Sequence, residues 1–330
     1  MEFKRTVHLI HKLITEHIVP GAAYAFYDGQ QWRDDIFGNR QWVPEVTPLT
    51  KGLTYDVASL TKVVATLPVI LQLIEEDRLG LDDSISQYLP EWQFPAVRVS
   101  NLLTHTSGIT GYIPHRDALN HAELTAALVH QLHVGPDLNH KMVYADVNFI
   151  FLGWIAERIL GQPIQQLAVQ RVFQPLMMNH STFTPRQSDC VPTVRLANGT
   201  VLQGIVDDPK ARVLGSQCGS AGLFSTISDL IKFTDEMLHP TGRILSRHTV
   251  NDLYHDHTAN GELGRSYGWA FDHLKHPFIW QTGYTGTAIV IDPVVHHALI
   301  LLTNRIHPAA PNEAFIPRRN QIIDTFLTEN

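Results

Sequence analysis

A serine and a lysine three positions apart, Ser59 and Lys62, form the pair in this sequence best suited to nucleophilic chemistry. Three residues make nearly one helical turn, so a helix that starts here would present both side chains on one face. A serine hydroxyl attacks a carbonyl only after losing its proton, and a lysine kept neutral by burial can take that proton. The backbone N–H of Ser59 would also stabilise an oxyanion at the helix start. The spacing predicts a nucleophile, although a serine that only caps the helix gives the same pattern.

A tyrosine and an acidic residue, Tyr144 and Asp146, lie at the start of a segment with helical apolar spacing, 146–160. A turn at this position would aim the Tyr144 hydroxyl at whatever the turn faces. In the non-catalytic interpretation Tyr144 is a half-buried aromatic residue and Asp146 caps the helix.

A third element, Gln281-Thr282-Gly283, ends a run of strand-forming residues. A glycine here would let a substrate approach the backbone closely, and the N–H of the next residue, Tyr284, could be a second oxyanion donor. The alternative is an ordinary strand end.

The elements that must position these residues follow from periodicity and turn signals. The predicted helices and strands enclose a long, mainly helical middle part. The expected helices are 6–18, 60–76, 121–133, 146–160, 163–173, 227–238 and 312–327, and the expected strands are 22–27, 31–37, 267–271, 278–281, 287–291 and 298–303. Pro68 should kink the second helix. The order predicts an α+β protein whose antiparallel sheet is flanked by N- and C-terminal helices.

Composition excludes several classes of protein. The 330 residues are 44% apolar, enough for a sizeable core, and their net charge of −7 argues against nucleic-acid binding. The longest apolar stretch, 63–74, is too short to span a bilayer, and no leader is visible, so we expect a cytoplasmic protein. The spacing of the 19 histidines predicts no metal site, and Cys190 and Cys218 form no redox or zinc motif.

Several segments in this order resemble the serine β-lactamase and penicillin-binding-protein superfamily, specifically its class C-like branch of carboxypeptidases, β-lactamases and esterases. The resemblance covers nearly the whole chain. Besides Tyr144-Ala145-Asp146 and Gln281-Thr282-Gly283, the segments that carry it are Asp56-Val57-Ala58-Ser59-Leu60-Thr61-Lys62, Leu102-Leu103-Thr104-His105-Thr106-Ser107-Gly108-Ile109, Ala221-Gly222-Leu223-Phe224-Ser225-Thr226 with Asp229-Leu230, and Leu302-Thr303-Asn304-Arg305.

The resemblance implies an α/β domain at 1–78 and 262–330, a mainly helical domain at 79–261, and an active site in the cleft between them. It makes Ser59 the acylated nucleophile, Lys62 its proton partner and Tyr144 the general base or proton relay. The N–H groups of Ser59 and Tyr284 would hold the oxyanion. It implies no metal, no organic cofactor and a mostly structural role for His105.

Two positions depart from the family pattern. Asp146 stands where an amide is usual, and a carboxylate beside Lys62 would raise the pKa of the lysine and move the base role towards Tyr144. We favour this over an Asp146 that only caps the helix while Asn148 takes the polar role. Gln281 stands where Lys or His usually faces a substrate carboxylate, so a charge-assisted contact of about 1.5–3 kcal/mol would be missing.

These observations favour a serine acyl hydrolase acting on a small ester or amide, such as a D-amino-acid peptide, with Asp146, Gln281, Thr282 and Gly283 as substrate-binding residues. One alternative is a β-lactam-binding D-Ala-D-Ala carboxypeptidase or a class C-type β-lactamase. The other is a non-catalytic binding protein on the same scaffold. The expected partner is a small molecule, and the sequence does not specify an oligomeric state.

Overall fold

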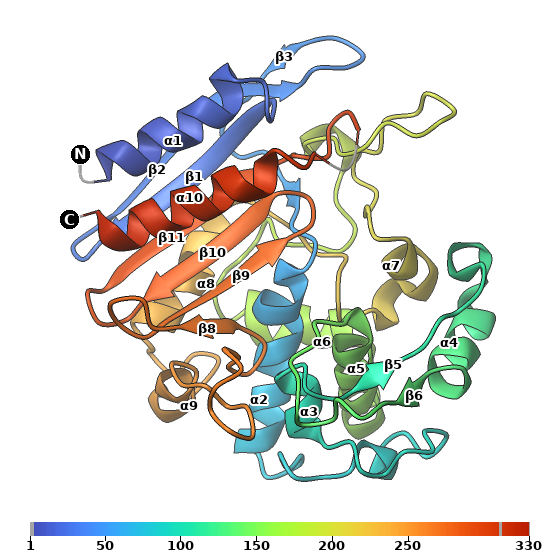
Figure 1. Ribbon diagram of the computed structural model, residues 1–330. Helices are drawn as coiled ribbons and strands as arrows, with labels where there is room; N and C mark the ends of the chain where they lie inside the picture. Colours follow the sequence, from blue (N-terminus) through green and yellow to red (C-terminus); the bar gives the residue numbers. More distant parts are fainter. Residues whose placement is uncertain (1–2, 310–311, 330) are drawn as a thin grey trace.

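The computed structural model describes residues 3–309 and 312–329 and combines one large antiparallel sheet with a helical part (Figure 1). The helices are α1 (Lys4–Thr15), α2 (Leu67–Glu75), α3 (Val99–Leu103), α4 (His121–His130), α5 (Asp146–Leu160), α6 (Ile164–Ala168), α7 (Pro209–Leu214), α8 (Ile227–Leu238), α9 (Arg247–Asp252) and α10 (Phe315–Thr328). The strands are β1 (Gly21–Asp28), β2 (Trp32–Gln41), β3 (Thr47–Pro48), β4 (Tyr55–Asp56), β5 (Ile109–Thr110), β6 (His133–Val134), β7 (Phe224–Ser225), β8 (Ala270–Asp272), β9 (Phe278–Gly283), β10 (Thr287–Asp292) and β11 (His297–Thr303).

The seven-stranded sheet has the order β3-β2-β1-β11-β10-β9-β8, and its neighbouring strands pair antiparallel. Successive side chains of a strand point to opposite faces, so each central strand contributes to two cores. On β1, Tyr24 and Phe26 pack with α1 and α10, whereas Ala23 and Ala25 face the larger core. The expected sheet flanked by N- and C-terminal helices is therefore confirmed, with α1 and α10 side by side on one face.

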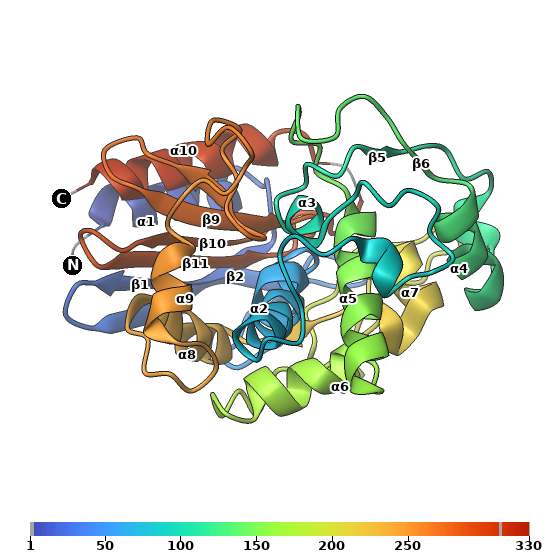
Figure 2. The ribbon, with the colours of Figure 1, turned by 90° about the horizontal axis from the view of Figure 1, so that it is seen from below.

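The other face of the sheet meets α8 and the larger hydrophobic core. In Figure 2 the sheet with α1 and α10 lies on the left, and α4, α5 and α7 lie on the right. Helix α5 is buried continuously from Val147 to Ala156, which makes it a firm support for the turn that precedes it. No helix in the described part of the chain is both long and apolar enough to cross a bilayer.

Some boundaries differ from the sequence prediction for local reasons. The chain distorts before Pro68: Lys62–Thr66 forms a π-helical turn and Pro68 then lies in the first turn of α2. A wide turn removes the clash between the proline ring and the carbonyl four residues earlier, so no kink inside the helix is needed. Strand β8 begins at Ala270 because Gly268 has a φ of 74° and its N–H donates to the Leu103 carbonyl.

Candidate active site

The turn that carries Ser59 is tightly fixed. It follows β4, and Ala58 adopts a φ of 47°, a left-handed conformation that a residue with a Cβ rarely takes. The N–H of Ala58 donates to Asp56 Oδ1 at 2.9 Å, and its carbonyl accepts from Thr61 Oγ1 at 2.6 Å. A strained conformation of this kind persists only where surrounding contacts hold the backbone in place. The turn therefore presents the Ser59 hydroxyl in one orientation.

Lys62 is fully buried one turn after the serine. Its Nζ donates to Ser59 Oγ at 2.8 Å and to the Ser220 carbonyl at 3.1 Å, and it pairs with Asp146 Oδ1 at 2.8 Å. These three oxygens match the three donors of an ammonium group. Burial by itself lowers the pKa of Lys62, but Asp146 and Tyr144 outweigh burial and hold it above its usual range. The lysine in the resting site is therefore a cation that donates to the serine.

Asp146, the first residue of α5, binds a second lysine with its other oxygen. Lys210 Nζ lies 3.0 Å from Asp146 Oδ2 and 2.9 Å from Asp208 Oδ2. Burial raises the pKa of Asp146, but the two lysines lower it further, so the net direction is down and the carboxylate is ionised. Lys62, Asp146, Lys210 and Asp208 thus form a row of alternating charges that extends from Ser59 to the N-terminus of α7.

Asn148 lies away from this row, contrary to the alternative in which it takes the polar role of Asp146. Its side chain bonds Ser107 Oγ at 2.7 Å and His105 Nδ1 at 2.9 Å. His105 also accepts from the Ala145 N–H at 3.3 Å, and its ring centroid lies 4.5 Å from that of Tyr144. Burial, with the charges of Arg265 and Lys62, holds the pKa of His105 well below its usual range. This neutral histidine supports the Tyr144 turn.

The Tyr144 side chain is 41% exposed. Two cationic side chains lie over its ring, and a side-chain amide donates to its hydroxyl oxygen. Lys62 Nζ lies 5.0 Å and Arg265 Cζ 5.3 Å from the ring centroid. Gln281 Nε2 donates to Tyr144 Oη at 2.9 Å, and Gln281 Oε1 accepts from Arg265 Nη2 at 3.4 Å. Gln281 itself carries no charge, and Arg265 brings a cation to its side chain from the segment before β8.

The end of β9 lies against the turn that carries Ser59. A Cβ on Gly283 would fall 2.1 Å from Thr287 Oγ1 and 2.5 Å from the Val57 carbonyl, so only glycine fits. Within the described residues, neither the Ser59 nor the Tyr284 N–H donates to a backbone or side-chain acceptor. Two free amides beside a partly exposed serine hydroxyl are suited to hold an oxyanion.

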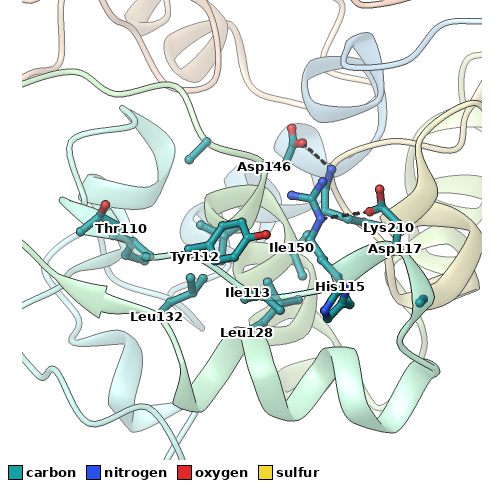
Figure 3. Close-up of a pocket in the computed structure, with 16 residues that line it drawn as sticks. Thr110, Tyr112, Ile113, His115, Asp117, Leu128, Leu132, Asp146, Ile150 and Lys210 are labelled. Atoms are coloured by element: carbon teal, nitrogen blue, oxygen red, sulfur yellow. Dashed lines mark hydrogen bonds and ion pairs between the residues drawn. The ribbon is translucent and has the colours of Figure 1, made fainter.

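Two cavities border the turn from Tyr144 to Asp146. The catalytic pocket, about 340 Å³ in volume, is lined by Ser59, Tyr144, Arg265 and the segment from Gln281 to Tyr284. A side pocket of about 740 Å³ lies on the far side of Asp146 (Figure 3). Its apolar wall includes Ile113, Leu128, Leu132 and Ile150, and the Asp146–Lys210 ion pair lies opposite. Asp146 therefore lies between the side pocket and Lys62, the lysine that binds Ser59.

The structure brings together the residues that the sequence singled out: Ser59, Lys62, Tyr144, Asp146 and the segment 281–284. Sequence reasoning missed Arg265 and Lys210. Neither side chain belongs to a motif whose spacing could have identified it.

Comparison with known proteins gives matches over almost the whole chain. A family model described as Beta-lactamase matches residues 7–321. A protein of Escherichia coli strain K12 named "Putative D-alanyl-D-alanine carboxypeptidase" is 27% identical over 311 residues, covering 78% of this chain and 70% of the relative.

Solved structures give the same fold. EstCE1, described as a hydrolase with promiscuous acyltransferase activity, matches with a TM-score of 0.78 and 19% identity, covering 98% of this chain and 97% of the other. A class C beta-lactamase in complex with cefoxitin matches with a TM-score of 0.78 and 21% identity, covering 99% of this chain and 98% of the other.

Proposed function

Because the chain belongs to the Beta-lactamase family, we propose that it is a serine acyl hydrolase whose Ser59 forms an acyl-enzyme with a small ester or amide. The observation that carries the proposal is the 2.8 Å hydrogen bond from Lys62 Nζ to Ser59 Oγ in a turn that faces the catalytic pocket. The reacting residues come from both halves of the chain, Ser59 and Gln281 from one and Tyr144 from the other. This distribution supports an active site in the cleft between 1–78 with 262–330 and 79–261.

Acylation starts with proton transfer from Ser59 to the Tyr144 oxygen in its phenolate form. Lys62 is occupied as an ammonium by Asp146, so the base role falls to the phenol. Ser59 Oγ attacks the carbonyl carbon, and the negative charge moves to the carbonyl oxygen between the Ser59 and Tyr284 amides. The bond to the leaving oxygen or nitrogen then breaks, and the leaving group takes the proton from Tyr144.

Deacylation repeats these steps with water as the nucleophile. The Tyr144 phenolate takes a proton from water, the hydroxide attacks the acyl carbon, and Ser59 leaves as its oxygen regains the proton. The same group acts first as base and then as acid in each half-reaction, so no external proton carrier is required.

The side pocket favours a substrate with an apolar acyl group. Its wall at Asp146 lies only two hydrogen-bond lengths from Ser59 Oγ, through Lys62. We propose that an acyl chain of moderate length extends past the Tyr144–Asp146 turn and packs against Leu128, Leu132 and Ile150 while its carbonyl stays at Ser59.

A second candidate function, β-lactamase or D-Ala-D-Ala carboxypeptidase, is favoured by the cations in the catalytic pocket. Arg265, Arg305 and Arg319 line it, and a guanidinium group is well suited to a substrate carboxylate. The name of the Escherichia coli relative points the same way.

Intact-mass measurement tests the proposal and separates the two candidates. The protein is incubated with short-chain p-nitrophenyl esters, a D-Ala-D-Ala peptide and a penicillin, and the adduct that accumulates identifies the acyl donor. Ser59→Ala should abolish both adduct and turnover, whereas Ser188→Ala, an exposed serine, should leave both unchanged. Full ester turnover by Ser59→Ala would refute the proposal.

A further inference from the structure

Arg265 is a buried cation without an acidic partner. Its side chain is 4% exposed, and no carboxylate lies within 4.0 Å of it among the described residues. Nη2 donates to the Gly268 carbonyl at 3.0 Å and to Gln281 Oε1 at 3.4 Å, and Nε has no hydrogen-bond partner in the described part of the chain. Burial lowers the pKa of Arg265 to about 10. Burying a charge without a counter-ion costs folding free energy, so a functional role would explain why this arginine is buried here.

Tyr144 is the group that this cation faces. The guanidinium lies over the tyrosine ring, and Gln281 connects the two residues through hydrogen bonds at both ends of its amide. An amide whose oxygen accepts from a cation is a more polarised donor at its nitrogen. The Gln281 N–H bond therefore carries part of the influence of Arg265 to the Tyr144 oxygen.

We propose that Arg265 is a positioning residue that acts through Gln281 to stabilise the negative charge that Tyr144 carries as the base. It thereby supplies the cation that glutamine at position 281 lacks. This inference rests on the proposed function, since it requires Tyr144 to accept the Ser59 proton.

The surrounding charges are compatible with this role. Lys62 adds a second cation beside the ring, and His105 behind the ring is neutral. Asp146 is the nearby anion, and Lys62 and Lys210 both bind it. The net effect of these groups on the Tyr144 oxygen is therefore attractive for negative charge.

Kinetics of Arg265→Met with p-nitrophenyl acetate test the proposal, because this ester has no carboxylate for the arginine to bind. We expect kcat/KM at pH 7 to fall by on the order of 10²-fold, the scale of general-base catalysis, mainly through kcat. The part of the profile that rises with pH should move to higher pH. Arg171→Met, which removes an arginine paired with Glu76 far from the site, is the matched control and should change neither.

Rescue provides the sharper test. Gln281→Lys in the Arg265→Met background places an ammonium directly beside Tyr144 and should restore most of the lost activity and the original pH profile. A purely structural role of Arg265 would not be rescued by this exchange. If Arg265→Met does not fold, as judged by circular dichroism, Gln281→Met is the second variant. It keeps Arg265 but removes the hydrogen bonds that join Arg265 to Tyr144, and it should lower kcat/KM by the same factor.

Three results would overturn the inference: unchanged p-nitrophenyl acetate kinetics in Gln281→Met and Arg265→Met, loss confined to the KM of carboxylate-bearing substrates, or failure of the lysine rescue. Labelling of Ser59 by a fluorophosphonate separates these results from failure of the proposed function. A wild-type protein that is not labelled refutes the serine hydrolase assignment itself, whereas labelled variants with unaltered kinetics refute only the role of Arg265.

Discussion

Asp146 Oδ1 lies 2.8 Å from Lys62 Nζ, and this ion pair is the closest charge contact of the lysine that donates to Ser59. It fixes Lys62 as an ammonium, and this makes activity depend on the lysine staying protonated as pH rises. The second oxygen of the same carboxylate binds Lys210, so the strength of the pair depends on a residue of α7.

Asp146→Asn should move the alkaline decline of kcat/KM to lower pH. The carboxylate raises the pKa of Lys62, and its removal lets the ammonium lose its proton at lower pH, by about 1–2 pH units. The measurement is hydrolysis of p-nitrophenyl acetate from about pH 7 to about pH 12, beyond the ordinary pKa of a lysine, with the spontaneous hydrolysis of the ester subtracted. Lys210→Met, which removes a competing cation from Asp146, should move the same decline in the opposite direction. Identical profiles for both variants and the wild type would contradict the assigned protonation state.

Gly283→Ala should destabilise the protein and remove most of its activity. The added methyl group would overlap Thr287 Oγ1 and the Val57 carbonyl, so β9 must separate from the nucleophile turn at a cost of about 1–3 kcal/mol. Urea unfolding and ester turnover report the two effects. Gly135→Ala is the control, since its Cβ would meet its nearest neighbour at an ordinary 3.4 Å. Wild-type stability in Gly283→Ala would show that the approach of β9 is looser than described.

Filling the side pocket should change chain-length preference without affecting the chemistry. Leu132→Trp enlarges a side chain in the apolar wall, so kcat/KM for p-nitrophenyl hexanoate should fall about 10-fold while that for the acetate stays the same. Leu274→Trp, at an exposed position, serves as the matched control. Equal effects on both esters would mean that the acyl group does not enter this pocket.

The sequence predicted those structural features that are set by the residue pattern within one segment. Strand-forming runs and helical spacing predicted the sheet and its flanking helices, and the Ser59–Lys62 spacing placed two groups on one turn. Asp146 could be placed near Lys62 because its motif keeps a fixed order with Ser59 in the family.

Arg265 and Lys210 could not be found in this way. Both reach the site through tertiary contacts between distant parts of the chain, Arg265 with Tyr144 and Lys210 with Asp146. An isolated basic residue has no distinguishing sequence pattern. The charge near Gln281 could not be predicted for the same reason: the residue type at one position does not show which charged residue another segment places beside it.

The pairing of β1 with β11 has a consequence for how the chain is made. Ala22 pairs with Thr303, so β1 leaves the ribosome long before β11 and has no neighbour on this edge until β11 has emerged. Until then the hairpin of β1 and β2 exposes an open edge and apolar side chains, which are sites of misassociation for a nascent chain. Completion of the sheet is therefore a late event in biogenesis, and β9, which borders the nucleophile, can take its final place only with it.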